Sequence, residues 1–307
     1  PQESLDVRGI QKLFSSGYYV RVLWFTTWQA ALSTLLTLLT ALPGAYVFAR
    51  YDFRGKALLQ VLTAVPFVLP TVVTAAAFRA LLGQGGMVNT GLMHLLNLNR
   101  PPINLEQTVW FFLMAHVFYN YTVILRIVGG FWTRLPNHLN DAARMLGASG
   151  AKIFFRVTLP LLMPAILASS LLVFIFCFTS FGVVLILGGP GLATVEVEIY
   201  RQAVHLFNLP MAAALSLIQI LFTFCLMALY TRLERQTSIS LIPEALSSST
   251  VAVRTRMDRF MVGLSFLFMI LLLGAPILAL LTRSILTETG PGFTYYRALF
   301  ETSAQSI

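Results

Sequence analysis

The sequence predicts an all-α, polytopic transmembrane helical bundle, and two observations support this fold class. Hydrophobic residues make up 57% of the 307-residue chain and charged residues only 11%, whereas soluble domains carry about 25% charged residues. The apolar residues also lie in continuous blocks, each long enough to supply the about 20 helical residues that cross a bilayer. We therefore expect a multi-pass protein of the plasma (inner) membrane.

Six apolar blocks predict six membrane-spanning helices. In chain order they cover residues 22–48, 58–82, 109–129, 161–187, 211–233 and 260–281. The polar turn from Arg50 to Lys56 is so short that the first two spans are expected to be antiparallel neighbours. A loop rich in Gly, Asn and Pro (83–107) follows the second span, and the glycines and proline of 188–191 end the fourth.

The distribution of Lys and Arg predicts the orientation, because cytoplasmic loops hold the positive excess. Basic residues are more numerous in and beside the alternate loops that include 131–156 and 234–258 than in the opposite set. This bias places both segments in the cytoplasm, with Pro1 and Ile307 outside. Residues 234–258 are also rich in Ser and Thr, so we expect them to form a linker.

A weak internal repeat predicts that the chain is part of a two-half protein. The segment QKLF (11–14) precedes the first block, and RALF (297–300) follows the last. If these positions are equivalent, the sixth block corresponds to a helix upstream of Pro1. The expected domains are a first half over residues 1–233, whose first helix lies upstream, a cytoplasmic linker over 234–258 and the beginning of a second half over 259–307.

The most informative segment is the basic stretch between the third and fourth blocks, residues 139–160, which we call the knuckle. From Leu139 to Leu146 small apolar side chains recur at helical spacing, and Gly147 to Gly150 predicts a turn. A second short helix is expected to end at Pro160. Alanines and glycines let a partner surface approach closely, so the knuckle is a candidate docking element.

The knuckle resembles the EAA signature of ABC importer permeases. That signature is Glu-Ala-Ala, a Gly four residues beyond the second Ala, and a hydrophobic-x-Leu-Pro ending that begins ten residues after the Gly. Asp141 replaces the usual Glu and Val157 the usual Ile, and both changes keep the chemistry. The matching positions are Asp141, Ala142, Ala143, Gly147, Val157, Leu159 and Pro160.

This resemblance implies a helical bundle of the ABC importer permease type, which forms a translocation pathway and couples to a cytoplasmic ATP-binding subunit through the knuckle. It implies three further partners, namely a periplasmic or extracellular substrate-binding protein, a second permease half that is fused or dimeric, and the lipid bilayer. The domains 1–233 and 259–307 would then be permease halves.

Other motifs resemble the permeases of thiamine and ferric-iron importers in particular. They lie at 28–30 and 32–33 in the first span, at 114–120 in the third, and at 177–182, 187–190, 193–194, 196 and 199–200. In that group one chain commonly carries two fused halves. The implied substrate is ferric iron or thiamine, with specificity mostly in the external binding protein.

The chain itself is not expected to be an enzyme or to hold a metal or cofactor. It lacks a Gly-x-x-x-x-Gly-Lys-Ser/Thr loop for ATP phosphates, so hydrolysis is expected in a partner. Cys177 and Cys225 lie inside apolar blocks without the neighbours of a metal site. The net charge of +9 does not indicate nucleic acid, because the basic residues lie between apolar blocks.

Polar residues inside the spans are candidates for the translocation pathway, although packing is the commoner role of each one taken separately. We place Asn120, Ser180 and Phe181 near the route. Glu196 and Glu198, in the loop after the fourth span, fit either contact with a binding protein or cationic substrate, or a solvated loop face.

Two other functions remain open at this point. An ion-driven secondary transporter would need carboxylates near mid-membrane, and none of the six blocks places one there. A membrane scaffold would leave the knuckle without a purpose.

Overall fold

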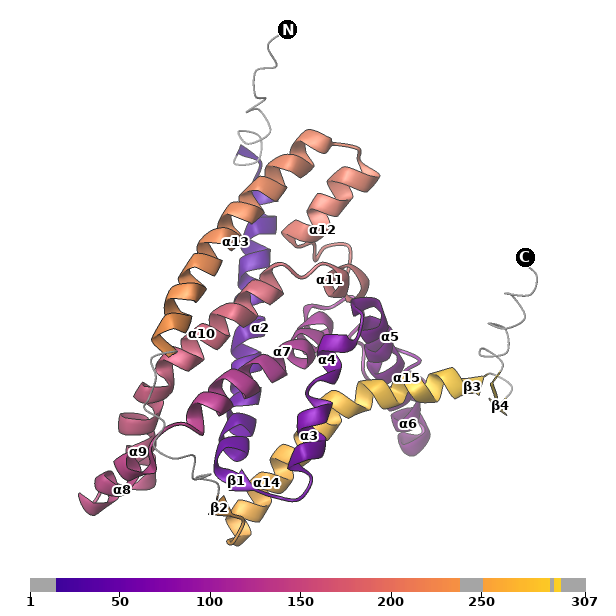
Figure 1. Ribbon diagram of the computed structural model, residues 1–307. Coiled ribbons are helices and arrows are strands. Elements are labelled where there is room, and N and C mark those ends of the chain that lie inside the picture. Colours follow the sequence, from indigo (N-terminus) through magenta and orange to yellow (C-terminus); the bar gives the residue numbers. More distant parts are fainter. Residues whose placement is uncertain (1–14, 238–250, 288–289, 294–307) are drawn as a thin grey trace, which may run out of the picture.

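The computed structural model describes residues 15–237, 251–287 and 290–293, and these are almost entirely helical (Figure 1). Within these ranges five helices are long and apolar enough to cross a membrane. They are α2 (Gly17–Arg50), α7 (Val109–Trp132), the run Gly150–Phe178, α13 (Leu209–Thr237) and the run Arg256–Ile285. The all-α class of the predicted bundle is confirmed.

The core of the bundle forms where α2, α7 and α10 (Leu159–Phe178) pack together. Phe112, Phe118 and Tyr121 of α7 are fully buried there, and aromatic side chains bury large apolar areas. Helix α2 comes close because Gly44 has no side chain, and a Cβ at that position would collide with the Tyr121 hydroxyl. Helix α7 is therefore the centre of the bundle.

The second predicted span, 58–82, is not one continuous helix. The segment forms α3 (Lys56–Leu62), α4 (Val65–Val68) and α5 (Thr71–Leu82). The chain bends by 114° between α4 and α5. Pro66 and Pro70 lack the N–H that a helical hydrogen bond needs, and their rings crowd the preceding turn, so this block cannot run back along α2 as a single helix.

The segment 83–107, predicted as a loop, contains α6 (Met87–Leu96). Buried Asn89 holds the segment together. Its Nδ2 donates to the carbonyl oxygens of Gly83 and Ile103, each at 2.8 Å, and its Oδ1 accepts from the Ile103 N–H at 2.9 Å. One amide therefore fixes the return of the chain from α6 toward α7.

The fourth predicted span is also interrupted. Helix α10 ends at Phe178, and α11 (Gly182–Leu187) begins after a turn at Thr179 and Ser180. Two short elements then lead to α13, namely α12 (Val195–Tyr200) and the π-helical η2 (Arg201–His205).

The sixth predicted span is a continuous helical run that returns to the first part of the chain. It consists of α14 (Arg256–Met269), the π-helical η3 (Ile270–Gly274) and α15 (Ala275–Ile285). The run begins beside the end of α2, where β1 (Tyr51–Asp52) pairs in parallel with β2 (Val251–Ala252). The Tyr51 hydroxyl donates to Asp258 Oδ1 at 2.9 Å, and α15 packs on α5.

A second short strand pair, β3 (Leu286–Thr287) and β4 (Gly290–Pro291), follows α15. The repeat segments 11–14 and 297–300 and most of the linker 234–258 lie outside the described residues. The domain boundaries 1–233, 234–258 and 259–307 therefore stay predictions.

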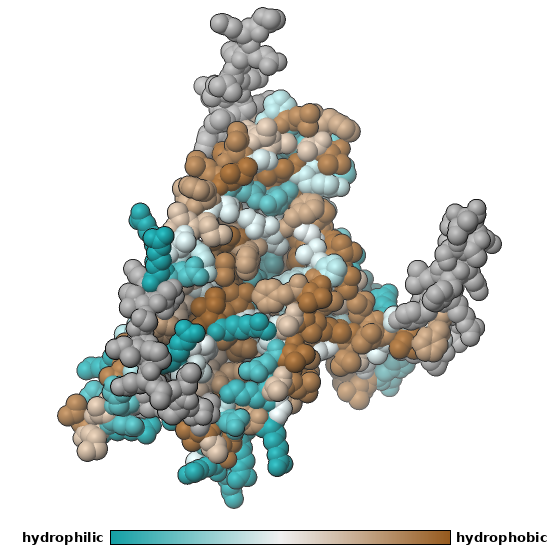
Figure 2. Space-filling view, viewed as in Figure 1, coloured by the Kyte–Doolittle hydropathy of each residue, from teal (hydrophilic) through white to brown (hydrophobic). Residues whose placement is uncertain are grey.

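The surface of the bundle differs along its length. Figure 2 shows hydrophobic residues over most of the shaft and many hydrophilic ones toward the end that carries β1, β2 and α8 (Asn137–Met145). We call this the β1 end and the opposite one the α12 end. Large side chains such as Leu217, Ile220 and Leu221 on α13 are exposed, as expected for a helix that faces lipid.

Candidate functional site

The knuckle projects from the β1 end as two short helices joined by a turn (Figure 1). The helices are α8 and α9 (Gly150–Ile153). Between them Gly147 has φ +77°, a left-handed conformation that favours glycine. The Gly147 N–H donates to the Arg144 carbonyl at 2.9 Å and the Ala148 N–H to the Ala143 carbonyl at 3.0 Å. This is the Schellman arrangement, which ends α8 sharply.

The tip of the knuckle exposes large apolar side chains. Met145 is 89% exposed and Leu146 is 88% exposed. Asp141 and Arg144 form an exposed ion pair at 4.0 Å on the same helix. An exposed apolar tip bordered by charges is the composition of a docking surface.

The residues predicted from the EAA resemblance lie in one continuous segment at the β1 end. The first four lie on α8 and in the turn after it, and the last three lie in η1 (Phe154–Thr158) and at the start of α10. They are Asp141, Ala142, Ala143 and Gly147, followed by Val157, Leu159 and Pro160. The Thr158 hydroxyl connects the two parts through a 3.4 Å hydrogen bond to Asn140 Oδ1. Whether this segment contacts a partner stays a prediction.

Pro160 does not end a second short helix, so that expectation was wrong. Helix α9 continues through the π-helical η1 (Phe154–Thr158) into α10. A proline ring excludes the carbonyl group four residues earlier, here that of Arg156. In η1 the Leu159 N–H bonds the Phe154 carbonyl, five residues back, and this wider turn accommodates the proline without breaking the helix.

A single helix therefore joins the knuckle to the middle of the bundle. It runs from Gly150 to Phe178, 29 residues, which corresponds to about 43 Å at 1.5 Å per residue. Ser180 and Phe181 follow directly after its far end. The knuckle and the predicted pathway residues Ser180 and Phe181 therefore lie at the two ends of one helix.

A cavity of about 560 Å³ lies between the knuckle and the ends of α2 and α10. Apolar side chains such as Tyr46, Phe154 and Leu162 line it, together with Arg50 and Arg144. The knuckle is thus not packed tightly against the bundle along its whole length.

A network of buried polar side chains crosses the bundle at the far end of the long helix. His116 of α7 lies at its centre. Its Nδ1 is 2.8 Å from Ser33 Oγ of α2, and its Nε2 is 2.9 Å from Ser180 Oγ. Gln29 of α2 donates to the Cys177 carbonyl at 2.9 Å. The network joins the three helices of the core.

The three predicted pathway residues have different surroundings. Ser180 belongs to the network, and Asn120 adjoins it, since its Nδ2 donates to the His116 carbonyl at 2.9 Å and to Cys177 Sγ at 3.4 Å. Phe181 instead contacts the ring of Tyr200, with centroids 5.3 Å apart. Gln29 and Ser33 also belong to this network, although no carboxylate or unusual spacing marks them in the sequence.

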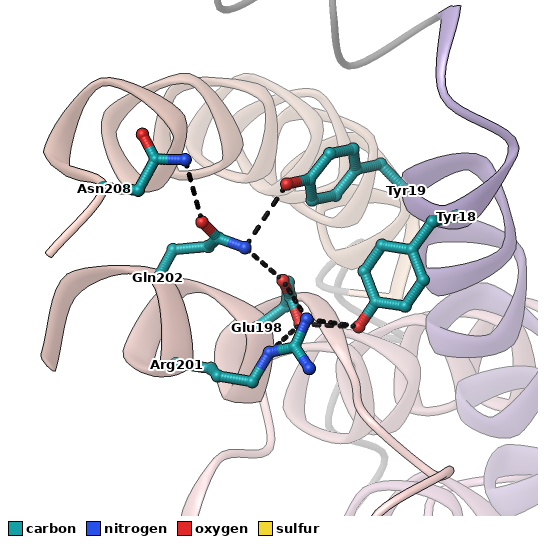
Figure 3. Close-up of polar contacts among 6 residues, drawn as sticks. All are labelled: Tyr18, Tyr19, Glu198, Arg201, Gln202 and Asn208. Carbon is teal, nitrogen blue, oxygen red and sulfur yellow. Dashed lines mark hydrogen bonds and ion pairs between the residues drawn. The ribbon is translucent and has the colours of Figure 1, made fainter. Parts of the chain in front are cut away.

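A second polar cluster lies at the α12 end, around Glu198 (Figure 3). The Glu198 side chain is fully buried, and its carboxylate meets the Arg201 Nε at 3.0 Å. The Tyr18 hydroxyl donates to it at 2.8 Å and Gln202 Nε2 at 2.7 Å. Gln202 also contacts the Tyr19 hydroxyl at 3.3 Å.

This Glu198 cluster ties the start of α2 to α12 and η2. Glu198 is therefore not on a solvated loop face. Its neighbour Glu196 is partly buried, and its Oε1 accepts from Gln219 Nε2 of α13. In the described part of the chain no group of three or more His, Cys, Asp or Glu side chains is placed to hold a metal ion.

Known proteins share this architecture and sequence. The permease protein ThiP of the thiamine transport system of Escherichia coli (strain K12) is 31% identical over 225 residues, which cover 73% of this chain and 41% of ThiP. ThiP of Brucella abortus (strain 2308) is 30% identical over 68% of this chain and 38% of its own length. The chain thus spans about two fifths of these relatives.

Another relative is the putative 2-aminoethylphosphonate transport system permease protein PhnU of Salmonella typhi, 24% identical over 76% of this chain and 81% of PhnU. Among solved structures, a bacterial ABC transporter involved in the import of the acidic polysaccharide alginate matches with a TM-score of 0.60 at 18% identity. That match covers 77% of this chain and 86% of the other chain. A bacterial alginate ABC transporter in complex with alginate pentasaccharide-bound periplasmic protein gives a TM-score of 0.58 at 18% identity.

The family described as binding-protein-dependent transport system inner membrane component matches residues 22–239. This match covers more than half of the chain and extends from α2 to the end of α13. The protein therefore belongs to this family, the inner-membrane permeases of ABC importers.

Proposed function

We propose that this chain forms the membrane pathway of an ATP-driven importer and that the knuckle couples it to a separate cytoplasmic ATP-binding subunit. The observation that carries the proposal is the exposed apolar tip at Met145 and Leu146, which lies one turn before the helix that continues from Gly150 into the bundle core. Exposed large apolar side chains that border charged ones favour a protein partner.

The long helix explains how movement at the knuckle reaches the pathway. The helical run from Gly150 to Phe178 is continuous, so we expect a shift of the segment around Gly150 to be transmitted toward Ser180. There it changes the distance between Ser180 and His116, which contact at 2.9 Å. The cavity of about 560 Å³ beside the knuckle leaves room for that displacement.

The orientation follows from the charge bias of the loops. With the β1 end in the cytoplasm, α8 faces the ATP-binding subunit and the Glu198 cluster faces the outside, where a substrate-binding protein docks. A second permease half, fused or in a dimer, completes the pathway in the inner membrane. The importer thus contains at least three kinds of component besides lipid.

Thiamine is the substrate that we propose. Both thiamine and ferric iron are implied by the sequence motifs, and the ThiP relatives favour thiamine. The relative PhnU, at lower identity, is named for a different substrate, 2-aminoethylphosphonate. Substrate choice is therefore expected to reside mainly in the binding protein.

The proposal is tested in proteoliposomes that contain the permease, its ATP-binding subunit and its binding protein. Met145→Ser with Leu146→Ser removes the apolar tip, and we expect thiamine uptake and substrate-stimulated ATP hydrolysis to fall about tenfold or more, as when central interface contacts are lost. Leu95→Ser with Leu96→Ser is the matched control, because these residues are also adjacent, apolar and exposed.

Retained coupling in the knuckle variant would contradict the proposal, as would uptake driven by an ion gradient without the ATP-binding subunit. Uptake of ferric iron but not thiamine would overturn the substrate and leave the coupling role intact.

A further inference from the structure

A separate cavity of about 350 Å³ lies between α3 and α7 at the β1 end. The side chains that line it include Phe48, Gln60, Thr63 and Leu125, together with two cations. On the α7 side the space beside Gly130 is open, since a Cβ there would meet nothing within 4 Å. The cavity belongs neither to the knuckle nor to the His116 network.

The two cations, Lys56 and Arg126, reach this cavity from different helices. Lys56 Nζ donates to the Tyr51 carbonyl at 2.9 Å, which leaves two of its three N–H groups. Arg126 Nη2 makes a long hydrogen bond of 3.4 Å to Thr63 Oγ1, and the guanidinium carries five N–H groups in all. Both side chains therefore keep donors for a ligand.

No carboxylate balances these charges inside the cavity. None of the residues that line it is acidic, and across the described ranges neither cation is in an ion pair. Asp52 is the acid nearby, and it does not line the cavity. A pocket with two cations and several hydroxyl or amide groups is complementary to a phosphate group.

Part of the cavity wall and the neighbouring outer face of α3 are apolar. Phe48 and Leu125 line it, and on α3 Leu58 is 60% exposed and Val61 is 68% exposed. Trp132, whose ring contacts Tyr46 at 5.3 Å, ends α7 at this level, where aromatic residues mark the interface between lipid and water. A ligand with acyl chains fits this position better than a free anion.

We propose that this cavity binds the headgroup of an anionic glycerophospholipid, with its phosphate held by Lys56 and Arg126 and an acyl chain along the outer face of α3. Basic pockets between membrane helices on the cytoplasmic side bind such headgroups, and on the orientation proposed above the β1 end lies there. The lipid links the broken second span to the central helix α7.

Native mass spectrometry of the intact, delipidated permease complex tests this, with phosphatidylglycerol, phosphatidylcholine and inorganic phosphate as probes. We expect one phosphatidylglycerol to bind at least about tenfold more tightly than phosphatidylcholine, since each basic residue contributes measurably to the affinity for anionic lipid. Lys56→Gln with Arg126→Gln should abolish that preference. Arg54→Gln with Arg134→Gln removes the same charge at exposed positions outside the cavity and should keep it.

A wild-type complex that binds both lipids equally would overturn the proposal, and so would a control variant that loses as much preference as the cavity variant. Inorganic phosphate that displaces phosphatidylglycerol at equal concentration would show that the ligand is a free anion. If the cavity variant fails to fold, Lys56→Arg with Arg126→Lys conserves the charge and must retain the preference.

Discussion

Two acid–arginine pairs in the described part of the chain have the same spacing along a helix and opposite surroundings. Asp141 and Arg144 lie 4.0 Å apart, with side chains that are 69% and 59% exposed. Glu198 and Arg201 lie 3.0 Å apart, and the Glu198 side chain is fully buried. The first pair is on the projecting α8, and the second fastens α12 to α2.

This difference shows how one sequence pattern serves two purposes. An exposed pair contributes little to stability because water screens it. Asp141 and Arg144 can therefore separate at little cost and bind charged groups on a partner. A buried carboxylate must keep its hydrogen-bond donors, so Glu198 holds its part of the structure in place. On the proposed coupling role, the exposed pair at the β1 end is available for contact, whereas the buried pair at the α12 end holds α12 against α2.

The largest effect is expected from Glu198→Ala, which removes the acid of the buried pair. Arg201, Gln202 and Tyr18 lose their common acceptor. We expect the free energy of unfolding to fall by about 3 kcal/mol, the lower end of the range for a broken buried pair, because Arg201 is partly exposed. Thermal unfolding of the purified complex in detergent measures it.

Asp141→Ala is the matched control for that variant, because it removes the acid of the exposed pair. Its stability should change by less than about 0.5 kcal/mol. Equal losses in the two variants would show that burial does not distinguish the pairs.

Gly147→Ala comes next and concerns the turn of the knuckle. The left-handed conformation at φ +77° disfavours any Cβ, so we expect a local cost of about 1 kcal/mol, together with reduced substrate-stimulated ATP hydrolysis. Gly150→Ala is the control, since its Cβ would also meet nothing within 4 Å and its backbone is not left-handed. The interpretation of the turn fails if both variants lose activity alike.

The smallest effect is a pH dependence at the α12 end. Burial raises the pKa of Glu196, while its hydrogen bond from Gln219 lowers it less. The folded protein therefore holds the proton of Glu196 more tightly than the unfolded chain does. This contributes to the stability of the folded state below the ordinary pKa of a glutamate, and the contribution is lost as the pH rises through the raised pKa.

Glu196→Gln removes that titration. Its unfolding temperature relative to wild type should therefore rise from about pH 4 toward neutrality and then stay level. A difference that is constant across this range would contradict the pKa shift.

The sequence predicts the long spans of this protein well, because a bilayer imposes a strong and simple pattern. It also predicts the knuckle, since Gly147 and the small residues before it specify a turn. It does not predict the bend at Pro70 or the continuation through Pro160. In each case the effect of a proline depends on whether a neighbouring turn can widen, as η1 does.

The candidate site was predicted in part. Ser180 and Asn120 were proposed as pathway residues from the sequence. The contacts of His116 with Ser33 and Ser180 could not be predicted, because they depend on how α7 packs against α2 and against the turn after α10. For Glu198 the sequence allowed either a binding contact or a solvated loop face. No local pattern shows that this carboxylate is buried, because one of its hydrogen-bond donors, Tyr18, lies 180 residues away in the sequence.

The most direct test of the coupling role is the accessibility of Leu146→Cys, in a chain whose exposed Cys225 is replaced by Ser and whose Cys177 is buried. In inverted membrane vesicles, a membrane-impermeant maleimide should label this cysteine when the ATP-binding subunit has been stripped off, and rebinding of that subunit should protect it. Labelling only from the opposite face of the membrane, or labelling that the subunit does not change, would contradict the account.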